Sequence, residues 1–175
     1  MNNAAIVSFR ANRNLESWIK YASYGFSSKA ELLSLVLTRM AYEQSLSGGL
    51  SQLLGRIIPD NRQTTIGNTK VYAVRIPVST VNIIKACAMA KHQNVSEWAS
   101  CTVGTWSQTF QQYKKEQEQK GRDDDDWLEQ YGQFFRDKVN QLVTVYAENT
   151  RKGRLKAVAG QGRRGGINIS EVFTT

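Results

Sequence analysis

The spacing of hydrophobic residues in the first 49 positions predicts a short strand followed by two helices. Apolar and polar residues alternate from Ile6 to Arg10, which is the pattern of a half-buried strand. The spacing of an amphipathic helix follows, with an apolar face of Leu15, Trp18, Ile19 and Ala22. Gly25 then interrupts the pattern, and Ser28 and Glu31 have the spacing of a capping box. A second helix is expected to end near Ser47, with an apolar face of Leu32, Leu33, Val36, Leu37 and Met40.

The same order of elements recurs 65 or 66 residues further along the chain. Residues 71–76 alternate as a strand that Pro77 ends. The next helix has an apolar face of Val81, Ile84, Cys87 and Ala88. After a turn at 91–94, Asn94 and Glu97 repeat the capping spacing, with Ser96 as a competing cap. The last helix of the repeat should reach about Lys120, with a face of Ala99, Thr102, Val103, Trp106, Phe110 and Tyr113.

The pattern divides the chain into five segments. Residues 1–49 and 70–120 are the two copies, and residues 50–69 form a connector that is expected to hold a short helix. Residues 121–150 form an amphipathic helix opened by the acidic run 123–126, and residues 151–175 form a basic, glycine-rich tail. The apolar stripe of that helix either packs on the repeats or meets a second copy of the chain, and it consists of Trp127, Leu128, Tyr131, Phe134, Phe135, Val139, Leu142, Val145 and Tyr146.

The composition is that of a basic globular protein. The formal net charge is +8 and the isoelectric point is about 9.6. The excess of positive charge lies in the repeats and in the tail, whereas residues 121–150 hold three Lys/Arg against seven Asp/Glu. This balance favours a polyanionic partner. The absence of a secretory signal and of a long apolar run predicts a cytoplasmic protein with no membrane partner.

Nothing in the sequence nominates a catalytic centre, a cofactor or a metal site. The chain has one histidine, His92, and two cysteines, Cys87 and Cys101, on predicted helices. These residues are too few for ordinary Cys/His metal coordination, so the cysteines are interpreted as small buried hydrophobic residues. The consecutive aspartates at 123–126 lack the alternation of a calcium loop. We therefore expect a protein that is not an enzyme.

The two copies resemble the ribbon-helix-helix (MetJ/Arc) family of DNA-binding proteins. In the second copy the resemblance rests on Val74-Arg75-Ile76-Pro77, a helix, a polar turn, and Ser96-Glu97 at the start of the next helix. In the first copy it rests on Ser8-Phe9-Arg10 and on the stretch from Gly25 to Leu33, and the two copies together cover roughly residues 4–112. The resemblance is to tandem, single-chain members such as those encoded by conjugative plasmids, and it implies a prokaryotic, nucleoid-associated protein.

The resemblance implies a mostly α-helical fold with a short two-stranded antiparallel ribbon, arranged as a pseudo-dimer with a C-terminal helical extension. The physical argument agrees, because a lone strand leaves its backbone groups unpaired and two short helices bury little surface. Two copies in one chain solve both problems by pairing their strands over a shared core. Alternation places Val7, Phe9, Tyr72, Val74 and Ile76 in that core.

A ribbon of this kind fits the major groove of double-stranded DNA, where its outward side chains read base edges. The outward candidates are Arg10 and Arg75, which can bond guanine, together with Ser8 and Ala73. Val71 and Ala73 are apolar where the family presents polar groups. The second strand therefore either reads a thymine methyl group or contributes little, and the ribbon is expected to be asymmetric.

Two further sets of DNA contacts are expected. The start of each capped helix offers backbone N–H groups and a helix dipole to a phosphate, and the candidates there are Ser27, Ser28, Lys29, Asn94, Val95 and Ser96. The tail would add nonspecific affinity through Arg151, Lys152, Arg154, Lys156, Arg163 and Arg164.

The predicted function is sequence-specific transcriptional regulation, most simply repression by occupying a promoter. The first alternative is a DNA-binding accessory of plasmid transfer (relaxosome) or partition that recruits a partner through its aromatic C-terminal helix. The second is a helical interaction module or antitoxin that does not bind DNA. Each of these interpretations is compatible with a homo-oligomer that forms through residues 127–146. Affinity that falls steeply with salt separates the DNA-binding interpretations from the last.

Overall fold

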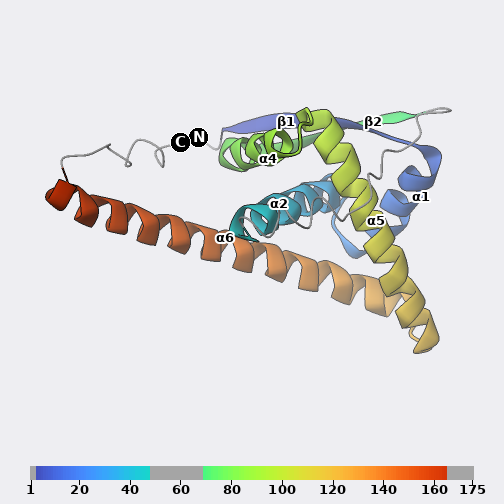
Figure 1. Cartoon of the computed structure of the whole chain (residues 1–175). Coiled ribbons are helices and arrows are strands. Elements are labelled where there is room, and N and C mark those ends of the chain that lie inside the picture. Colours follow the sequence, from blue (N-terminus) through green and yellow to red (C-terminus); the bar gives the residue numbers. More distant parts are fainter. Residues whose placement is uncertain (1–2, 48–68, 165–175) are drawn as a thin grey trace.

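The computed structural model describes residues 3–47 and 69–164, with side chains as far as residue 153. Its first unit consists of β1 (Ala4–Ala11), α1 (Arg13–Ala22), the 3₁₀ turn η1 (Ser23–Gly25) and α2 (Lys29–Ser47). Its second unit consists of β2 (Lys70–Pro77), α4 (Val78–Ala90) and α5 (Val95–Gln119), and α6 (Asp124–Arg164) follows. The predicted order of strand, helix and helix therefore occurs twice (Figure 1). The short helix expected in the connector lies outside the described residues.

The strands of the two units pair with each other in an antiparallel two-stranded sheet, which confirms the predicted pairing. Ala4 lies opposite Pro77 at one end, and Ala11 lies opposite Lys70 at the other. The predicted inward residues of both strands are buried, and Phe9 stacks on Tyr72, its direct partner, with 5.6 Å between ring centroids. Two strands alone are marginal in water, so the helices beneath this face stabilise the ribbon.

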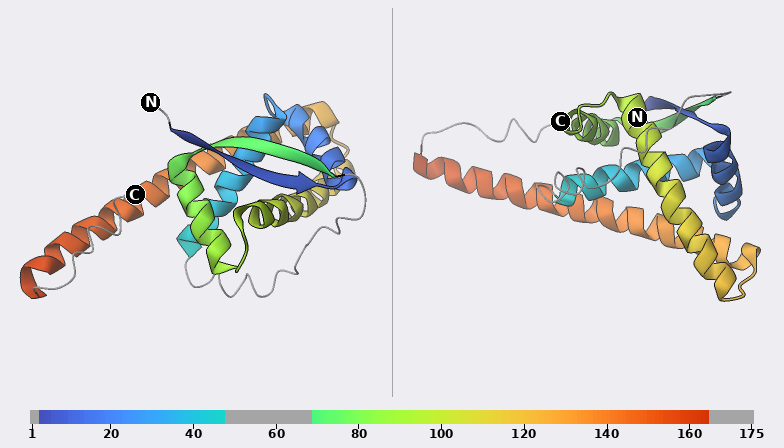
Figure 2. Two further views of the ribbon diagram at one scale, coloured as in Figure 1. Left: turned by 90° about the horizontal axis from the view of Figure 1, so that it is seen from above. Right: turned by 45° about the vertical axis from the view of Figure 1, so that its right-hand side comes forward.

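The core lies between the ribbon and the four helices α1, α2, α4 and α5 (Figures 1 and 2). The predicted apolar faces supply most of it, although Trp18, Met40 and Tyr113 are only partly buried. Three large buried residues were not predicted, since Trp98 is buried beside α2, Phe26 beside α6, and Tyr42 of α2 beside Tyr146 of α6. Phe26 lies between helices, where helical periodicity gives no signal, whereas Trp98 lies four residues before Thr102 and belongs to the predicted face of α5.

Both second helices begin at the predicted caps. Ser28 Oγ accepts a hydrogen bond from the backbone N–H of Glu31 at 3.0 Å. Asn94, and not Ser96, caps α5, because its side chain accepts from Glu97 N while the Glu97 carboxylate accepts from Asn94 N. That reciprocal pair is a complete capping box, which satisfies two N–H groups that the helix itself leaves unpaired.

α6 folds back from α5 and runs along α2 on the side of the helices away from the ribbon (Figures 1 and 2). The predicted stripe thus packs on the two units of the same chain, with Trp127, Leu128, Phe135 and Val139 buried. Phe110 of α5 lies at the centre of this packing and contacts Trp18, Tyr21, Trp106, Trp127 and Tyr131. Two members of the predicted stripe point outward instead, since Phe134 is 64% exposed and Val145 is 38% exposed.

α6 is longer than the sequence pattern predicts. The helix was expected to end near residue 150 and to give way to a glycine-rich tail, but it continues to Arg164. The physical reason is that isolated glycines cost a helix only about 1 kcal/mol each and do not by themselves end it. Residues 151–164 contain no proline, and good helix formers such as Arg, Lys, Leu and Ala separate their glycines.

A close glycine contact holds α6 against the first unit. A Cβ built on Gly132 of α6 would lie 1.8 Å from the backbone oxygen of Gly25, and one built on Gly25 would lie 2.2 Å from the oxygen of Leu128. Any side chain at either position would push the two backbones apart. Gly25, which was expected only to end a helix, therefore also permits this docking.

Neither cysteine forms a disulfide with a described residue, and the two differ in burial. Cys87 is buried, as predicted, and its burial raises the pKa of the thiol. Cys101 is only partly buried, so the prediction holds less well there. None of the helices in the described part of the chain combines the length and the apolar character needed to cross a bilayer.

Candidate nucleic-acid interface

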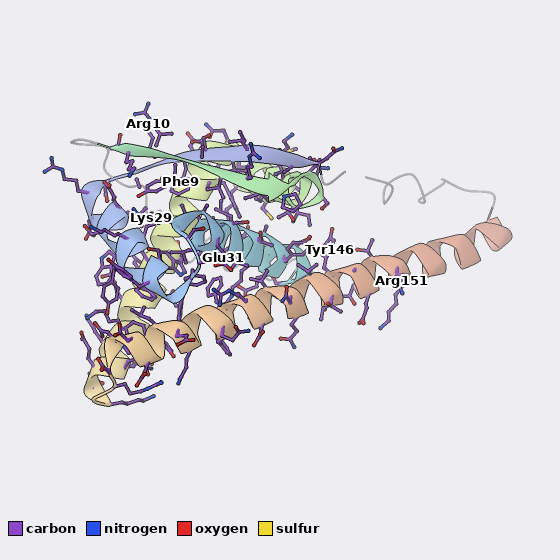
Figure 3. All side chains as sticks on the ribbon, turned by 180° about the vertical axis from the view of Figure 1, so that it is seen from behind. Phe9, Arg10, Lys29, Glu31, Tyr146 and Arg151 are labelled. Atoms are coloured by element: carbon purple, nitrogen blue, oxygen red, sulfur yellow. The ribbon has the colours of Figure 1, made fainter. Side chains whose placement is uncertain are left out.

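The outer face of the ribbon carries the residues that the sequence nominates for reading bases. Ser8 and Arg10 on β1 and Ala73 and Arg75 on β2 are all exposed, as strand alternation predicts. Figure 3 shows the Arg10 side chain rising from the ribbon away from the helices. The ribbon therefore presents one uninterrupted exposed face, with its opposite face closed by the core.

The strand register relates the two halves of this face by an approximate two-fold axis. Ser8 lies directly opposite Ala73, and these two residues are also 65 positions apart in the sequence. The same offset converts Ile6 into Val71 and Arg10 into Arg75. The axis thus passes between Ser8 and Ala73, and each strand presents an aliphatic residue, a small residue and an arginine in the same order. The asymmetry expected for the ribbon is therefore a difference in polarity at the central pair, where Ser8 is polar and Ala73 is apolar.

The arginine at one end of the face is partly held by its neighbours. Arg10 Nη1 donates to Thr69 Oγ1 at 3.4 Å, and the Arg10 carbonyl accepts from Ser100 Oγ of α5 at 3.0 Å. Below the same end, Lys70 lies 3.7 Å from Glu16 and over the ring of Tyr72. These contacts fix the backbone of β1 on α5, whereas the guanidinium group of Arg10 stays at the exposed surface.

The predicted phosphate site at the start of α2 carries a carboxylate of its own. Ser27 donates from both its backbone N–H and its hydroxyl to Glu31 Oε2, each at 2.7 Å. Arg136 of α6 binds the same carboxylate at 2.8 and 3.2 Å, and this ion pair lowers the pKa of Glu31 to about 2. A charged carboxylate therefore stands at this helix start throughout the neutral range, where it repels a phosphate and competes for the Ser27 donors.

The predicted phosphate site at the start of α5 also carries a carboxylate, that of Glu97. Val95 is partly buried, Ser96 is exposed, and the Glu97 carboxylate accepts from the Asn94 backbone. Seen from above, α2 and α5 begin on opposite sides of the ribbon (Figure 2). The two predicted sites therefore lie on either side of the ribbon, and each carries the carboxylate of its capping glutamate, which at α2 is also paired with Arg136.

The basic residues of α6 lie apart from the ribbon. Arg151 and Lys152 are exposed on α6, and Figure 3 shows Arg151 on the opposite side of the helices from Arg10. The structure does not bring these two residues together with Ser8, Arg10, Ala73 and Arg75. The side chains of Arg154, Lys156, Arg163 and Arg164 lie outside the described residues.

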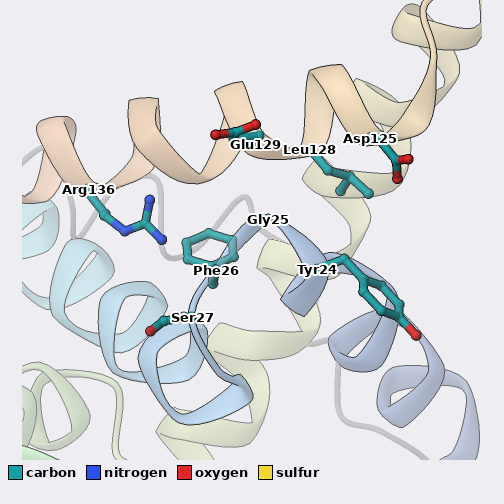
Figure 4. Close-up of a pocket in the computed structure, with 8 residues that line it drawn as sticks. All are labelled: Tyr24, Gly25, Phe26, Ser27, Asp125, Leu128, Glu129 and Arg136. Atoms are coloured by element: carbon teal, nitrogen blue, oxygen red, sulfur yellow. The ribbon is translucent and has the colours of Figure 1, made fainter.

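A cleft of about 440 Å³ lies between the first unit and α6 (Figure 4). It is lined by Tyr24, Gly25, Phe26, Ser27, Asp125, Leu128, Glu129 and Arg136. The Arg136 guanidinium lies over the ring of Phe26 and is paired with Glu31, so the cation is engaged within the chain. In the part of the chain that is described, no three His, Cys, Asp or Glu side chains gather closely enough to hold a metal ion.

Two residues of the outer face were not nominated from the sequence. Ile6 and Val71 are 63% and 55% exposed, and each lies beside one of the two arginines. Strand alternation placed both outward, and the apolar character of Val71 and Ala73 suggested a thymine methyl contact for the second strand, but no role was assigned to Ile6. The register adds that Ile6 lies opposite Arg75 and that Val71 lies opposite Arg10.

Comparisons with protein-family models, with curated proteins and with solved structures found no match to this chain.

Proposed function

We propose that the chain is a tandem ribbon-helix-helix protein that binds double-stranded DNA with the outer face of its ribbon and regulates transcription, most simply by repression. The observation that carries the proposal is the pairing of β1 with β2 about the Ser8–Ala73 pair, at the offset of the sequence repeat. One chain thereby forms a two-fold ribbon of the kind that enters a major groove.

The chemistry of the outer face supports DNA as the partner. Arg10 and Arg75 stand at equivalent positions, and a guanidinium group can donate two hydrogen bonds to the O6 and N7 atoms of guanine. No acidic residue occupies an outward position on either described strand. The net charge of +8 favours a polyanionic partner.

The proposal of a recruited partner is supported less well by the folded chain. Two aromatic residues of the stripe that such a partner would use, Trp127 and Phe135, are buried within the chain. A regulator that acts by occupying DNA needs no such surface. The two roles are separated by where the protein binds in a genome, since promoters favour regulation and arrays beside a transfer or centromere site favour the accessory role.

The test is selection of duplexes from a randomised pool, followed by titration of the selected site at several salt concentrations. We expect a defined site, with affinity that falls steeply as salt rises. Arg151→Ala on α6 is the control for a lost positive charge. It should weaken binding to all sequences alike, whereas Arg10→Ala should weaken the selected site most. Equal binding to all duplexes at every salt concentration would reject sequence-specific regulation.

A further inference from the structure

The two exposed aliphatic residues of the ribbon occupy equivalent places on its outer face. Ile6 is 63% exposed and Val71 is 55% exposed, and each extends from a strand whose other outward positions are small, cationic or terminal. Leaving a large aliphatic side chain in water forgoes the stabilisation of about 1.5–3 kcal/mol that burial would give. One such residue is unremarkable, but two related by the axis of the ribbon suggest a shared contact.

The register places each aliphatic residue beside an arginine of the other strand. Val71 lies directly opposite Arg10, and Ile6 lies directly opposite Arg75. Opposed residues on one face of an antiparallel pair have Cβ atoms about 4.5–5.5 Å apart. Each end of the outer face therefore presents a hydrogen-bond donor and an apolar surface side by side, and the small pair Ser8–Ala73 separates the two ends.

We infer that Ile6 and Val71 contact thymine methyl groups, next to guanines contacted by Arg75 and Arg10 respectively; this inference rests on the proposed function. The 5-methyl group of thymine is the one apolar group on the base edges of the major groove, and guanine offers two acceptors to an arginine. The preferred site is then an inverted repeat whose half-sites each contain a thymine next to a guanine. The centre of the repeat lies at the Ser8–Ala73 pair.

A second copy of the chain is the other occupant that two exposed aliphatic residues suggest. Such an interface would bring the outer faces of two ribbons together, and each face carries Arg10 and Arg75. The outward positions of the described strands hold no acidic residue to pair with these cations. Burying the arginines of two such faces against one another, away from water, is costly. The positive charge of the outer face therefore favours a polyanion as the partner of this face.

The experiment replaces thymine by deoxyuridine in the selected duplex, which removes only the methyl group. We expect about a fourfold loss of affinity for one thymine and roughly a fifteenfold loss for both, which is the factor for about 0.8 kcal/mol for each methyl group. Val71→Ala and Ile6→Ala should each bind the thymine and deoxyuridine versions of their own half-site equally well. Val145→Ala on α6, another exposed valine, is the matched control and should keep the full preference for thymine.

The outcomes separate this inference from the proposed function. If no duplex is selected, both fail. If a selected site depends on Arg10 and Arg75 but binds equally well with deoxyuridine, DNA recognition stands and the role of Ile6 and Val71 is rejected. The role is also rejected if the chain sediments as a dimer without DNA and Val71→Ala makes it a monomer, because the aliphatic residues would then serve a second copy.

Discussion

The two units of this chain share one backbone plan, but α6 runs along the turn and the second helix of the first unit, and it meets the second unit through the aromatic residues of α5. Phe26 packs on Tyr131 and Phe135 of α6, and Tyr42 packs on Tyr146. At the equivalent places of the second unit, 66 residues later, stand His92 and Gln108, and both are exposed. One plan can therefore be finished in two ways, because Phe26 and Tyr42 of the first unit lie against α6, whereas their counterparts His92 and Gln108 stay exposed.

The turns between the two helices of each unit differ accordingly. In the first unit Gly25 lets the backbone of α6 approach closely. In the second unit His92 takes a positive φ of 55°, a conformation that non-glycine residues adopt only at some cost, and its side chain is exposed. The first turn is thus shaped by a neighbouring helix, whereas the second turn is held by backbone hydrogen bonds to the end of α4.

The largest expected effect comes from breaking the contact that distinguishes the first unit. Gly132→Ala places a Cβ against the backbone oxygen of Gly25, so we expect a loss of about 3 kcal/mol in the free energy of unfolding. Urea denaturation measures it. Gly153→Ala is the control, because a Cβ there meets nothing within 4 Å and should be neutral or gain up to about 1 kcal/mol. Equal stability of the Gly132 variant and the wild type would show that the close contact does not hold α6.

The next effect tests whether the two units contribute equally to DNA recognition. Arg10→Ala and Arg75→Ala should each keep the fold and lose roughly 1–3 kcal/mol of discrimination between sequences. Because the arginines stand at opposite ends of the ribbon, each variant should relax the base preference in a different half-site. Selection from randomised duplexes measures it. Binding like wild type by both variants, together with its abolition by charge changes at Arg151 and Lys152, would show that the ribbon is not the interface.

A smaller effect sharpens the comparison of the two capping glutamates. The hydrogen bonds from Arg136 lower the pKa of Glu31 from 4.5 to about 2, so this carboxylate stabilises the fold above pH 4.5. That contribution should be lost as the pH falls from about 4.5 to 2, because the unfolded chain then binds the proton first. After allowance for solvent screening, Glu31→Gln should cost about 1–2 kcal/mol at pH 7.

The matched control is Glu97→Gln in the second unit. Glu97 has the same position in its helix, but its carboxylate is bonded to the Asn94 backbone and not to α6. Glu97→Gln should lower the free energy of unfolding at pH 7 by less than Glu31→Gln does. Denaturation at a series of pH values measures both losses. If the Glu31→Gln variant loses stability between about pH 4.5 and 2 just as the wild type does, the acid-dependent stability does not come from Glu31.

The smallest effect concerns the caps themselves. Ser28→Ala and Asn94→Ala should each cost about 1 kcal/mol, because each removes the acceptor for a backbone N–H in the first turn. Amide hydrogen exchange in the first turns of α2 and α5 locates the loss. In the first unit Arg136 continues to hold Glu31 beside the helix start, so fraying there should be less than at α5. Greater fraying at α2 would indicate that α6 does not support this cap.

The strands, the four helices of the two units and both caps could be predicted because their signals are local. Alternation at Val7 and Phe9 and the spacing of Ser28 and Glu31 each depend on a few neighbouring residues. The outward positions of Arg10 and Arg75 follow from the same alternation, so the exposed face of the candidate interface was predictable.

The packing of α6 could not be predicted, and neither could the ion pair that places a charged carboxylate at the start of α2. Both depend on contacts between residues that are distant in the sequence. Glu31 and Arg136 are 105 residues apart, and no local pattern pairs them. The same holds for Gly25 and Gly132, whose close approach exists only in the folded chain. The sequence left open whether the aromatic stripe meets the same chain or another, since either choice buries the same side chains.

The joining of β1 and β2 within one polypeptide has a consequence for how the protein behaves at low abundance. A ribbon built from two separate subunits dissociates on dilution, and its assembly depends on the concentration of each. Here the partner strand is always present at a fixed ratio of one to one, so a few molecules per cell keep the ribbon intact. In a ribbon of two identical subunits, every substitution appears in both strands. Here the two strands can diverge, because a substitution at Ser8 leaves Ala73 unchanged.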